Sequence, residues 1–334
     1  MKTPPSLVPD LETLTAGLTA TLRNGSVPRR VRVLKRKPPR FMSTFPNEIV
    51  TCLLPNGRRR RVFIKYEGDR FHNCFGHRGG VAYEARVYQR LLNSLPEFHP
   101  KCLGAHCDPQ ACGTWLILEF VYRAVRVSDL SYHQSTAQAC ARIKSARWLA
   151  AFHAAFESGV HDPALSFLKG YDAEYYRGWA GRTFEFAAPL RSRFPWLRTL
   201  ADCGDAWFAP LLMKPLTLIH GEFYARTVLV REENLFVTDW ESAAVAPGEI
   251  DLATLSEGKH WREPLARQCE REYQRVRWPD GTPADFKLRL DAARMYLHFR
   301  WLGERPEKTV SEKNLWRYQQ LRAAARRLGL IEGP

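Results

Sequence analysis

The sequence predicts an α+β fold in two lobes, a small β-rich lobe over residues 1–121 and a larger, mostly helical lobe over residues 122–334. Three observations support this division. Short runs rich in β-branched residues fill the first 120 positions, helical periodicity dominates from about Ser135, and one β-like island over residues 216–239 interrupts the helical part. A chain of 334 residues is long enough to build two such lobes around real hydrophobic cores.

A β-hairpin is the clearest local prediction in the first lobe. Ile49–Leu54 and Val62–Tyr66 are short runs with β-branched and aromatic residues. Asn56-Gly57 between them is a dipeptide that favours a two-residue hairpin turn. The arginine run at positions 58–61 follows this turn, and a solvated strand edge is its expected role, with a specific anion site as the alternative.

One helix and further strands complete the expected elements of this lobe. Val31–Leu34 is another short β-branched run, and Thr114–Val121 is apolar enough to predict a buried strand. Val81–Leu92 follows a glycine-rich break, and its apolar residues recur with helical period.

The rest of the chain is expected to be helical around a small β-structure. Helices are predicted at residues 141–156, 173–192, 259–276, 284–303 and 311–328. The island supplies three short strands, Leu216–His220, Thr227–Val230 and Leu235–Asp239.

Composition indicates a globular protein, with 45% hydrophobic and 25% charged residues. No apolar run approaches the roughly 20 residues that cross a bilayer, and the first residues lack the apolar segment of a secretory signal. We therefore expect a cytoplasmic protein without a membrane partner, in which the eight cysteines are reduced. Cys102, His106, Cys107 and Cys112 form an alternative zinc-ligand set, but their spacing lacks the paired C-x2-C of zinc ribbons and fingers.

The net charge of +15 is unevenly distributed. Residues 29–61 contain eleven Lys or Arg and a single acid, Glu48, so nucleic-acid or anionic-lipid binding is one hypothesis for this lobe. The sequence carries no nucleic-acid module signature, and a specific nucleic-acid partner is not expected.

Two carboxylates of the island are placed as phosphoryl transfer requires. Glu222 lies in a loop just after one expected strand, and Asp239 ends another strand 17 residues later. Phosphoryl transfer needs one group beside the acceptor hydroxyl and a hard oxygen ligand for the Mg²⁺ that bridges the phosphates. A carboxylate that ends an apolar strand is costly unless it is paired or metal-bound, which makes Asp239 the stronger candidate.

Around these carboxylates the sequence resembles the aminoglycoside phosphotransferases, small-molecule kinases with a protein-kinase-like fold. The family pattern is HGDxxxxN, an IDWE-like strand and a D-P-x-x-D-L-A segment. The matching residues are His220, Gly221, Asp239, Trp240, Glu241, Asp251, Leu252 and Ala253. In the first lobe, Lys65 resembles the strand lysine that holds the α- and β-phosphates, and Glu84 resembles its ion-pair partner.

The resemblance implies a site for ATP and Mg²⁺. Leu116–Phe120 is similar to the hinge whose backbone binds adenine, so Leu118, Glu119 and Phe120 are the expected hinge contacts. By the same resemblance, Glu222 would be the base or hydroxyl-positioning group, Asp239 would hold Mg²⁺, and Thr227 takes the place of the family's metal-binding Asn. His220 and Asp251 would brace the catalytic loop.

Each of these residues also has a structural interpretation. Lys65 could be a surface strand residue, and Glu84 an exposed helix residue. His220 fits a hydrogen-bonded structural histidine better than a proton carrier. Asp251, ahead of Leu-Ala-Thr-Leu, fits a helix N-cap-type carboxylate.

Two hypotheses for the function follow. The first is an ATP-dependent phosphotransferase that transfers the γ-phosphoryl group to a hydroxyl of a small-molecule metabolite or antibiotic-like acceptor. The second is a catalytically impaired kinase fold, a pseudokinase that binds nucleotide or a partner. Two departures from the family pattern favour the second hypothesis. Glu222 is one methylene longer than the family's Asp, and Thr227 is a poorer metal ligand than the family's Asn.

The last segment of the chain gives the only sequence-based indication of the acceptor. Residues 258–334 hold 17 basic and 10 acidic residues and are rich in aromatic side chains. A neutral or anionic hydroxyl acceptor is therefore expected in preference to a polycationic aminoglycoside.

Overall fold

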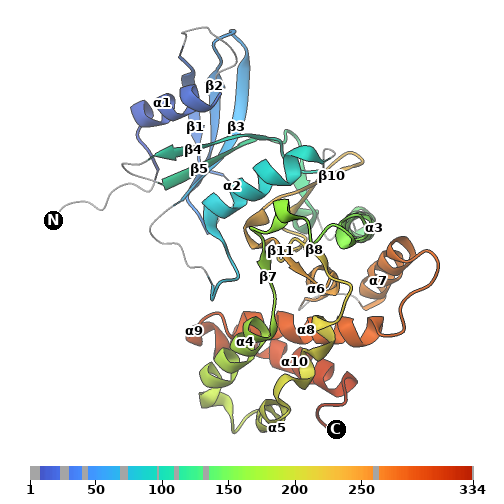
Figure 1. Ribbon diagram of the computed structural model, residues 1–334. Coiled ribbons are helices and arrows are strands. Elements are labelled where there is room, and N and C mark those ends of the chain that lie inside the picture. The colour runs from blue at the N-terminus through green and yellow to red at the C-terminus, as the bar shows by residue number, and fades with distance from the viewer. Residues whose placement is uncertain are drawn as a thin grey trace, which may run out of the picture. The chain divides into compact units, whose positions relative to one another are not determined.

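The computed structural model of the chain describes residues 8–22, 30–39, 44–67, 74–95, 98–108, 113–130, 135–258 and 263–332. They fall in two units (Figure 1). The first unit combines Met1–Val125 with Leu229–Ser242, and the second combines Arg126–Val228 with Ala243–Pro334.

A five-stranded sheet with the order β1-β2-β3-β5-β4 forms the centre of the first unit. Its strands are β1 (Arg32–Lys37), β2 (Asn47–Leu53), β3 (Arg59–Tyr66), β4 (Cys102–Asp108) and β5 (Gly113–Glu119). Each pair of neighbouring strands in this order is antiparallel. The predicted strands at 31–34, 49–54, 62–66 and 114–121 are thus confirmed, with boundaries shifted by a few residues.

The turn between β2 and β3 differs from the prediction because of Pro55. A two-residue turn at Asn56-Gly57 would need the N–H of residue 55 to close the hairpin, and proline has none. The closing bond instead runs from the Leu54 N–H to the Arg58 carbonyl, at 2.9 Å. The loop therefore holds three residues, and its last one, Gly57, adopts the left-handed conformation with φ +77°.

Two helices contact this sheet, whereas the sequence predicted one. Helix α2 (Gly80–Arg90) is the predicted one and contacts β4 and β5. The additional helix, α1 (Leu11–Thr21), buries Leu14 and Leu18 against a cluster that includes Ile64 and Trp115. Since side chains alternate along β3, Ile64 points toward α1, and Lys65 points to the opposite face.

A pair of helical glycines tests this packing. Gly17 in α1 lies so close to the buried Trp115 ring that a Cβ would clash with it, so Gly17→Ala is expected to destabilise the protein by about 1–3 kcal/mol. At Gly181 in α4 (Ala173–Phe186), a Cβ would have no described heavy atom within 4 Å apart from its chain neighbours and the backbone of its own helix. Gly181→Ala is therefore expected to stabilise by about 0.5–1 kcal/mol. Thermal unfolding of both variants measures the difference, and equal effects would contradict the packing of α1.

A hairpin from the middle of the chain completes the first unit. Strands β9 (Val228–Arg231) and β10 (Asn234–Val237) lie in a second sheet with the order β10-β9-β6, where β6 is Val125–Arg126. The Val237 N–H donates to the Phe98 carbonyl at 2.8 Å, which joins the hairpin to the earlier part of the unit. The residue two positions after β10 is Asp239.

The second unit is mainly helical, as predicted. Its principal helices are α3 (Ser135–Glu157), α4, α5 (Trp196–Asp202), α6 (Glu249–Ser256), α7 (Glu263–Arg277), α8 (Phe286–Leu302), α9 (Pro306–Thr309) and α10 (Leu315–Arg327). A small sheet with the order β7-β11-β8 consists of Lys169–Gly170, Ala244–Ala246 and Thr217–Ile219. Strand β8 runs directly into His220. No helix among the described residues is long and apolar enough to span a bilayer.

Candidate active site

Three predicted residues of the first unit form one charged cluster. The Lys65 Nζ lies 2.7 Å from the Glu84 Oε2 and 2.5 Å from the Asp239 Oδ1. Lys65 and Glu84 are 3% and 0% exposed, so neither is a solvated surface residue. The Asp239 side chain is 37% exposed and is the member of the cluster that solvent reaches. We call these residues the lysine cluster.

Opposing effects set the protonation of the lysine cluster. Burial by itself lowers the pKa of Lys65, but the Asp239 and Glu84 carboxylates outweigh it and the net pKa is raised. Burial raises the pKa of the Glu84 carboxyl, and the Lys65 ammonium opposes that shift. The second Glu84 oxygen, Oε1, accepts the Trp240 N–H at 3.1 Å. Glu84 therefore holds both the lysine and the backbone that follows Asp239.

The backbone at Asp239 is strained. Its φ is +66°, in the left-handed region that few residues other than glycine adopt. Such conformations persist where the surrounding contacts impose them, and they are concentrated at functional sites. Here the Lys65 contact on the side chain and the Trp240 N–H bond to Glu84 fix the residue from both sides.

The predicted hinge residues lie at the end of β5. The Leu118 side chain is buried, and the N–H groups of the next two residues are used within the unit. Glu119 donates to the Lys101 carbonyl at 2.9 Å, and Phe120 donates to the Arg61 carbonyl at 3.3 Å. The N–H of the following residue, Val121, forms no hydrogen bond among the described residues. Next to the predicted hinge residues, the first N–H without a partner among the described residues is therefore that of Val121, which was not among the predicted contacts.

Asp251 organises the loop after β8 in the second unit. Its side chain is fully buried, and it accepts the N–H of His220 at 2.6 Å and that of Gly221 at 2.9 Å. Asp251 is the third residue of α6, and the N-cap position belongs to Gly248. The N-cap interpretation is therefore wrong. The His220 Nδ1 accepts the Glu222 N–H at 3.2 Å, which makes His220 a structural residue of this loop.

Thr227 lies at the other end of the same loop. Its hydroxyl is within hydrogen-bond distance of two carbonyls, those of Glu222 at 3.0 Å and Tyr224 at 2.9 Å. The residue is 2% exposed, and its own N–H donates to Tyr224 as well. The hydroxyl proton is thus directed into the loop and closes it.

Glu222 is paired with an arginine that the sequence analysis did not identify. The Arg300 Nη1 of α8 lies 3.2 Å from the Glu222 Oε1, and both side chains are at most 5% exposed. Arg300 Nη2 also donates to the Tyr224 hydroxyl, and so does the Trp301 indole at 2.7 Å. The ion pair fixes the position of the longer Glu222 side chain.

A chain of buried hydrogen bonds connects Asp251 to a cavity wall. Its carboxylate lies 3.4 Å from the His153 Nε2, and the His153 Nδ1 lies 2.8 Å from the Tyr273 hydroxyl. Burial lowers the pKa of His153, against the opposing bond to Asp251. The Tyr273 hydroxyl is also hydrogen-bonded to Arg277, whose Nη2 pairs with Glu157 at 3.1 Å.

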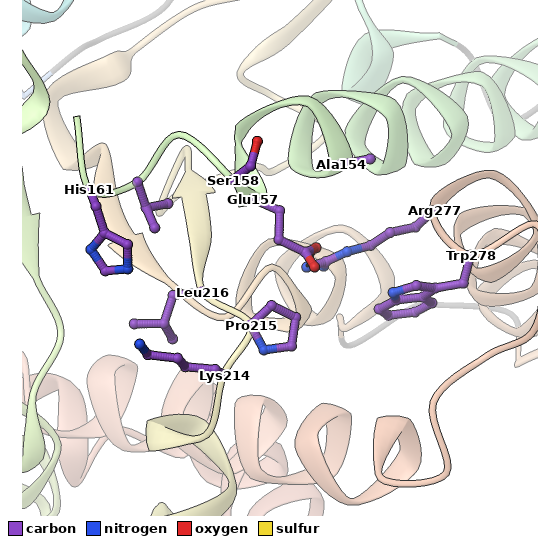
Figure 2. Close-up of a pocket in the computed structure, with 10 residues that line it drawn as sticks. Ala154, Glu157, Ser158, His161, Lys214, Pro215, Leu216, Arg277 and Trp278 are labelled. Atoms are coloured by element: carbon purple, nitrogen blue, oxygen red, sulfur yellow. Dashed lines mark hydrogen bonds and ion pairs between the residues drawn. The ribbon is translucent and has the colours of Figure 1, made fainter.

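Glu157 and Arg277 line a cavity of about 550 Å³, which Figure 2 shows between α3, α7 and the segment before β8. The other lining residues are Ala154, Ser158, Val160, His161, Lys214, Pro215, Leu216 and Trp278. None of the predicted site residues lines it. The alternative zinc set includes Cys112, which lies outside the described residues. Within the described ranges, no three or more His, Cys, Asp or Glu side chains are grouped so that they could hold a metal ion.

A comparison with protein families gives one match. The sequence model of the APH phosphotransferase enzyme family matches residues 56–284. This range contains each predicted site residue, from Lys65 to Asp251, and excludes Arg300. No curated protein matches the sequence significantly.

Solved structures share the fold at low sequence identity. The choline kinase LicA of Streptococcus pneumoniae has a TM-score of 0.61 and 12% identity, over 96% of this chain and 99% of that one. A choline kinase of Cryptosporidium parvum has a TM-score of 0.58 and 13% identity, over 96% and 98%. A spectinomycin phosphotransferase solved with ADP and spectinomycin has a TM-score of 0.56 and 13% identity, over 96% and 98%. The predicted kinase-like α+β fold is confirmed.

Proposed function

Because the chain belongs to the APH phosphotransferase enzyme family, we propose that it is a kinase that transfers the γ-phosphoryl group of ATP to a hydroxyl of a small molecule. The lysine cluster carries this proposal. A buried lysine held between two carboxylates, one of them 37% exposed, has few uses in a purely structural role. The neighbour that was solved with ADP supports a nucleotide as the phosphoryl donor.

In this proposal each residue of the first unit acts on the nucleotide. Lys65 binds the phosphates, and Glu84 keeps its ammonium in place. Asp239 suits Mg²⁺ because it is an exposed carboxylate, the hard oxygen ligand that this ion prefers. A bound Mg²⁺ would neutralise charge on the phosphates. The Val121 N–H, beside Leu118, Glu119 and Phe120, would donate to the adenine ring.

In the second unit, Glu222 would orient the acceptor hydroxyl and accept its proton. Asp251 and His220 hold the backbone of the loop, so the Glu222 carboxylate starts from a fixed position. The Arg300 guanidinium, 3.2 Å away, holds the Glu222 carboxylate in this position. Thr227 remains a predicted second metal ligand, and its hydroxyl also closes the loop.

A catalytically impaired kinase fold is the second candidate. The Glu222–Arg300 pair favours it, because a carboxylate already bound to a buried guanidinium is less available to a substrate hydroxyl. This candidate retains nucleotide binding through the lysine cluster and lacks turnover. Measurement of ADP release with varied acceptors distinguishes the two candidates, because only the active kinase releases ADP.

Calorimetric titration of Mg²⁺-ATP tests the nucleotide site. We expect Mg²⁺-dependent binding to the wild-type chain and a loss of at least about tenfold in affinity for Asp239→Ala, because a charged metal contact is removed. Asp205→Ala is the matched control, since this carboxylate forms an exposed ion pair with Arg177. A folded wild-type chain that does not bind Mg²⁺-ATP would contradict the proposal.

A further inference from the structure

Four cationic side chains of the second unit surround one indole ring. The guanidinium carbons of Arg226, Arg300 and Arg317 lie 5.8, 5.0 and 4.4 Å from the centre of the Trp301 ring, and the Lys308 Nζ lies 5.7 Å from it. We call these four residues the cationic cluster. Each gains from the π face of the ring, but like charges this close repel one another.

Two of these four cations form ion pairs with described carboxylates. Glu222 pairs with Arg300 at 3.2 Å, and Glu304 pairs with Lys308 at 3.0 Å. Arg226 and Arg317 form no ion pair within the described residues. An assembly of four cations and two carboxylates, part of it buried, is stabilised by any anion that enters it.

Arg317 is the least satisfied member of the cluster. Its Nε is buried and forms no hydrogen bond within the described ranges, although buried polar atoms are normally bonded. Burial lowers the pKa of Arg317 to about 10. Arg300 and Arg226 add to this shift, and Tyr224 and the Glu257 carboxylate oppose it. The guanidinium stays charged at neutral pH, and it shares the Trp301 ring with the guanidiniums of Arg226 and Arg300.

Tyr224 adds a directed donor beside the cluster. Its phenolic oxygen accepts from Arg300 and from Trp301, which uses both lone pairs. Its own O–H proton has no acceptor within the described part of the chain. The residue is only partly buried, so a ligand oxygen can reach this proton.

We propose that the cationic cluster and Tyr224 bind an oxyanion of the acceptor, a carboxylate or a phosphate group, next to Glu222. The proposal rests on the proposed function and names the class of acceptor that its site takes. Arg226 and Arg317 would pair with the oxyanion, and Tyr224 would donate its proton to it. Arg300 links the two ends of the site, because it contacts both Glu222 and Tyr224.

Three matched probes test this inference by binding alone. They are sn-glycerol 3-phosphate, D-glycerate and uncharged glycerol, which share hydroxyl groups and differ in the anion. Each is titrated calorimetrically into the full chain with saturating Mg²⁺-ADP, which keeps the probes away from Lys65. We expect saturable binding of at least one anionic probe and none of glycerol. The probe that binds distinguishes a phosphate from a carboxylate acceptor.

Substitutions in the cationic cluster show whether the anionic probe binds there. Arg317→Gln and Arg226→Gln are each expected to lower the affinity for the anionic probe by about tenfold or more, because a charged hydrogen bond is lost. Arg226 is exposed, so its variant is expected to fold even if Arg317→Gln does not. Arg191→Gln, at an exposed arginine of the same unit, is the control and should have no effect.

Several outcomes would overturn the inference. These are no binding of either anionic probe, binding of glycerol with equal affinity, or binding that Arg226→Gln and Arg317→Gln leave unchanged. The cluster would then be a solvated cation–π surface. If Mg²⁺-ADP does not bind, this result contradicts the proposed function and not the oxyanion site. Titration of the same probes without nucleotide then still tests the oxyanion site.

Discussion

Replacing Lys65 with methionine is expected to lower turnover by at least about a thousandfold, because the charge that is proposed to bind the phosphates is lost. The same change removes the cation that compensates Glu84, which is 0% exposed. Breaking a buried ion pair from one side typically costs about 3–5 kcal/mol of stability. Steady-state ADP release and equilibrium unfolding in urea measure the two effects separately.

A second substitution separates stability from activity. In Lys65→Met/Glu84→Gln the buried pair is replaced by two neutral side chains, and the Gln carbonyl can still accept the Trp240 N–H. We expect this double variant to recover most of the lost stability and none of the lost turnover. Lys313→Met, at an exposed lysine, is the control. A Lys65→Met variant with normal turnover would show that the lysine cluster is structural only.

Removal of the Asp251 side chain is the second large expected effect. Asp251→Ala leaves the buried N–H groups of His220 and Gly221 without an acceptor, and each charge-assisted bond is worth about 1.5–3 kcal/mol. We therefore expect a loss of about 3–5 kcal/mol in unfolding free energy. Turnover falls as well, because the same N–H groups position Glu222.

Asp251→Asn provides the comparison for this prediction. The amide keeps one oxygen acceptor and nearly the same shape, so the loss of stability should be clearly smaller than in Asp251→Ala. Chemical denaturation of both variants, monitored by tryptophan fluorescence, gives the two free energies of unfolding to be compared. Equal stability of the wild type and Asp251→Ala would mean that the loop does not depend on this carboxylate.

The sequence predicted Lys65 and Glu84 through their resemblance to the family's strand lysine and its ion-pair partner. Alternation along the strand and exposure on the helix left a surface position open for both, and the fold shows that both are buried. Asp239 was predicted from the apolar strand that precedes it, because a carboxylate there is costly unless it is paired or metal-bound. The motif residues can thus be read in the sequence, whereas the contacts among the three side chains come from the fold.

Helix α1 escaped prediction because its threonines weaken the helical signal. Thr15, Thr19 and Thr21 are poor helix formers, yet each hydroxyl donates to the carbonyl four residues earlier. Packing of Leu14 and Leu18 on the sheet outweighs that low propensity. Tertiary contacts of this kind cannot be seen in a local window of sequence.

Arg300 could not be found from the sequence for a different reason. Helix α8 is buried along most of its length, so it has no polar face on which one residue would stand out. The contact with Glu222 joins residues far apart in the chain, and only the fold brings them together. The Val121 N–H, which we propose as the contact to adenine, could likewise be selected only once the hydrogen bonds of Glu119 and Phe120 were known.

The return of Leu229–Ser242 to the first unit has a consequence for protein synthesis. Lys65 and Asp239 are 174 positions apart. At about 5–20 residues per second, the ribosome needs roughly ten to thirty seconds to make the chain between them. During this interval the nascent sheet and α2 lack β9 and β10. The amino-terminal unit therefore cannot mature as an independent early domain, and a fragment that stops near residue 125 would display Lys65 and Glu84 without their third partner.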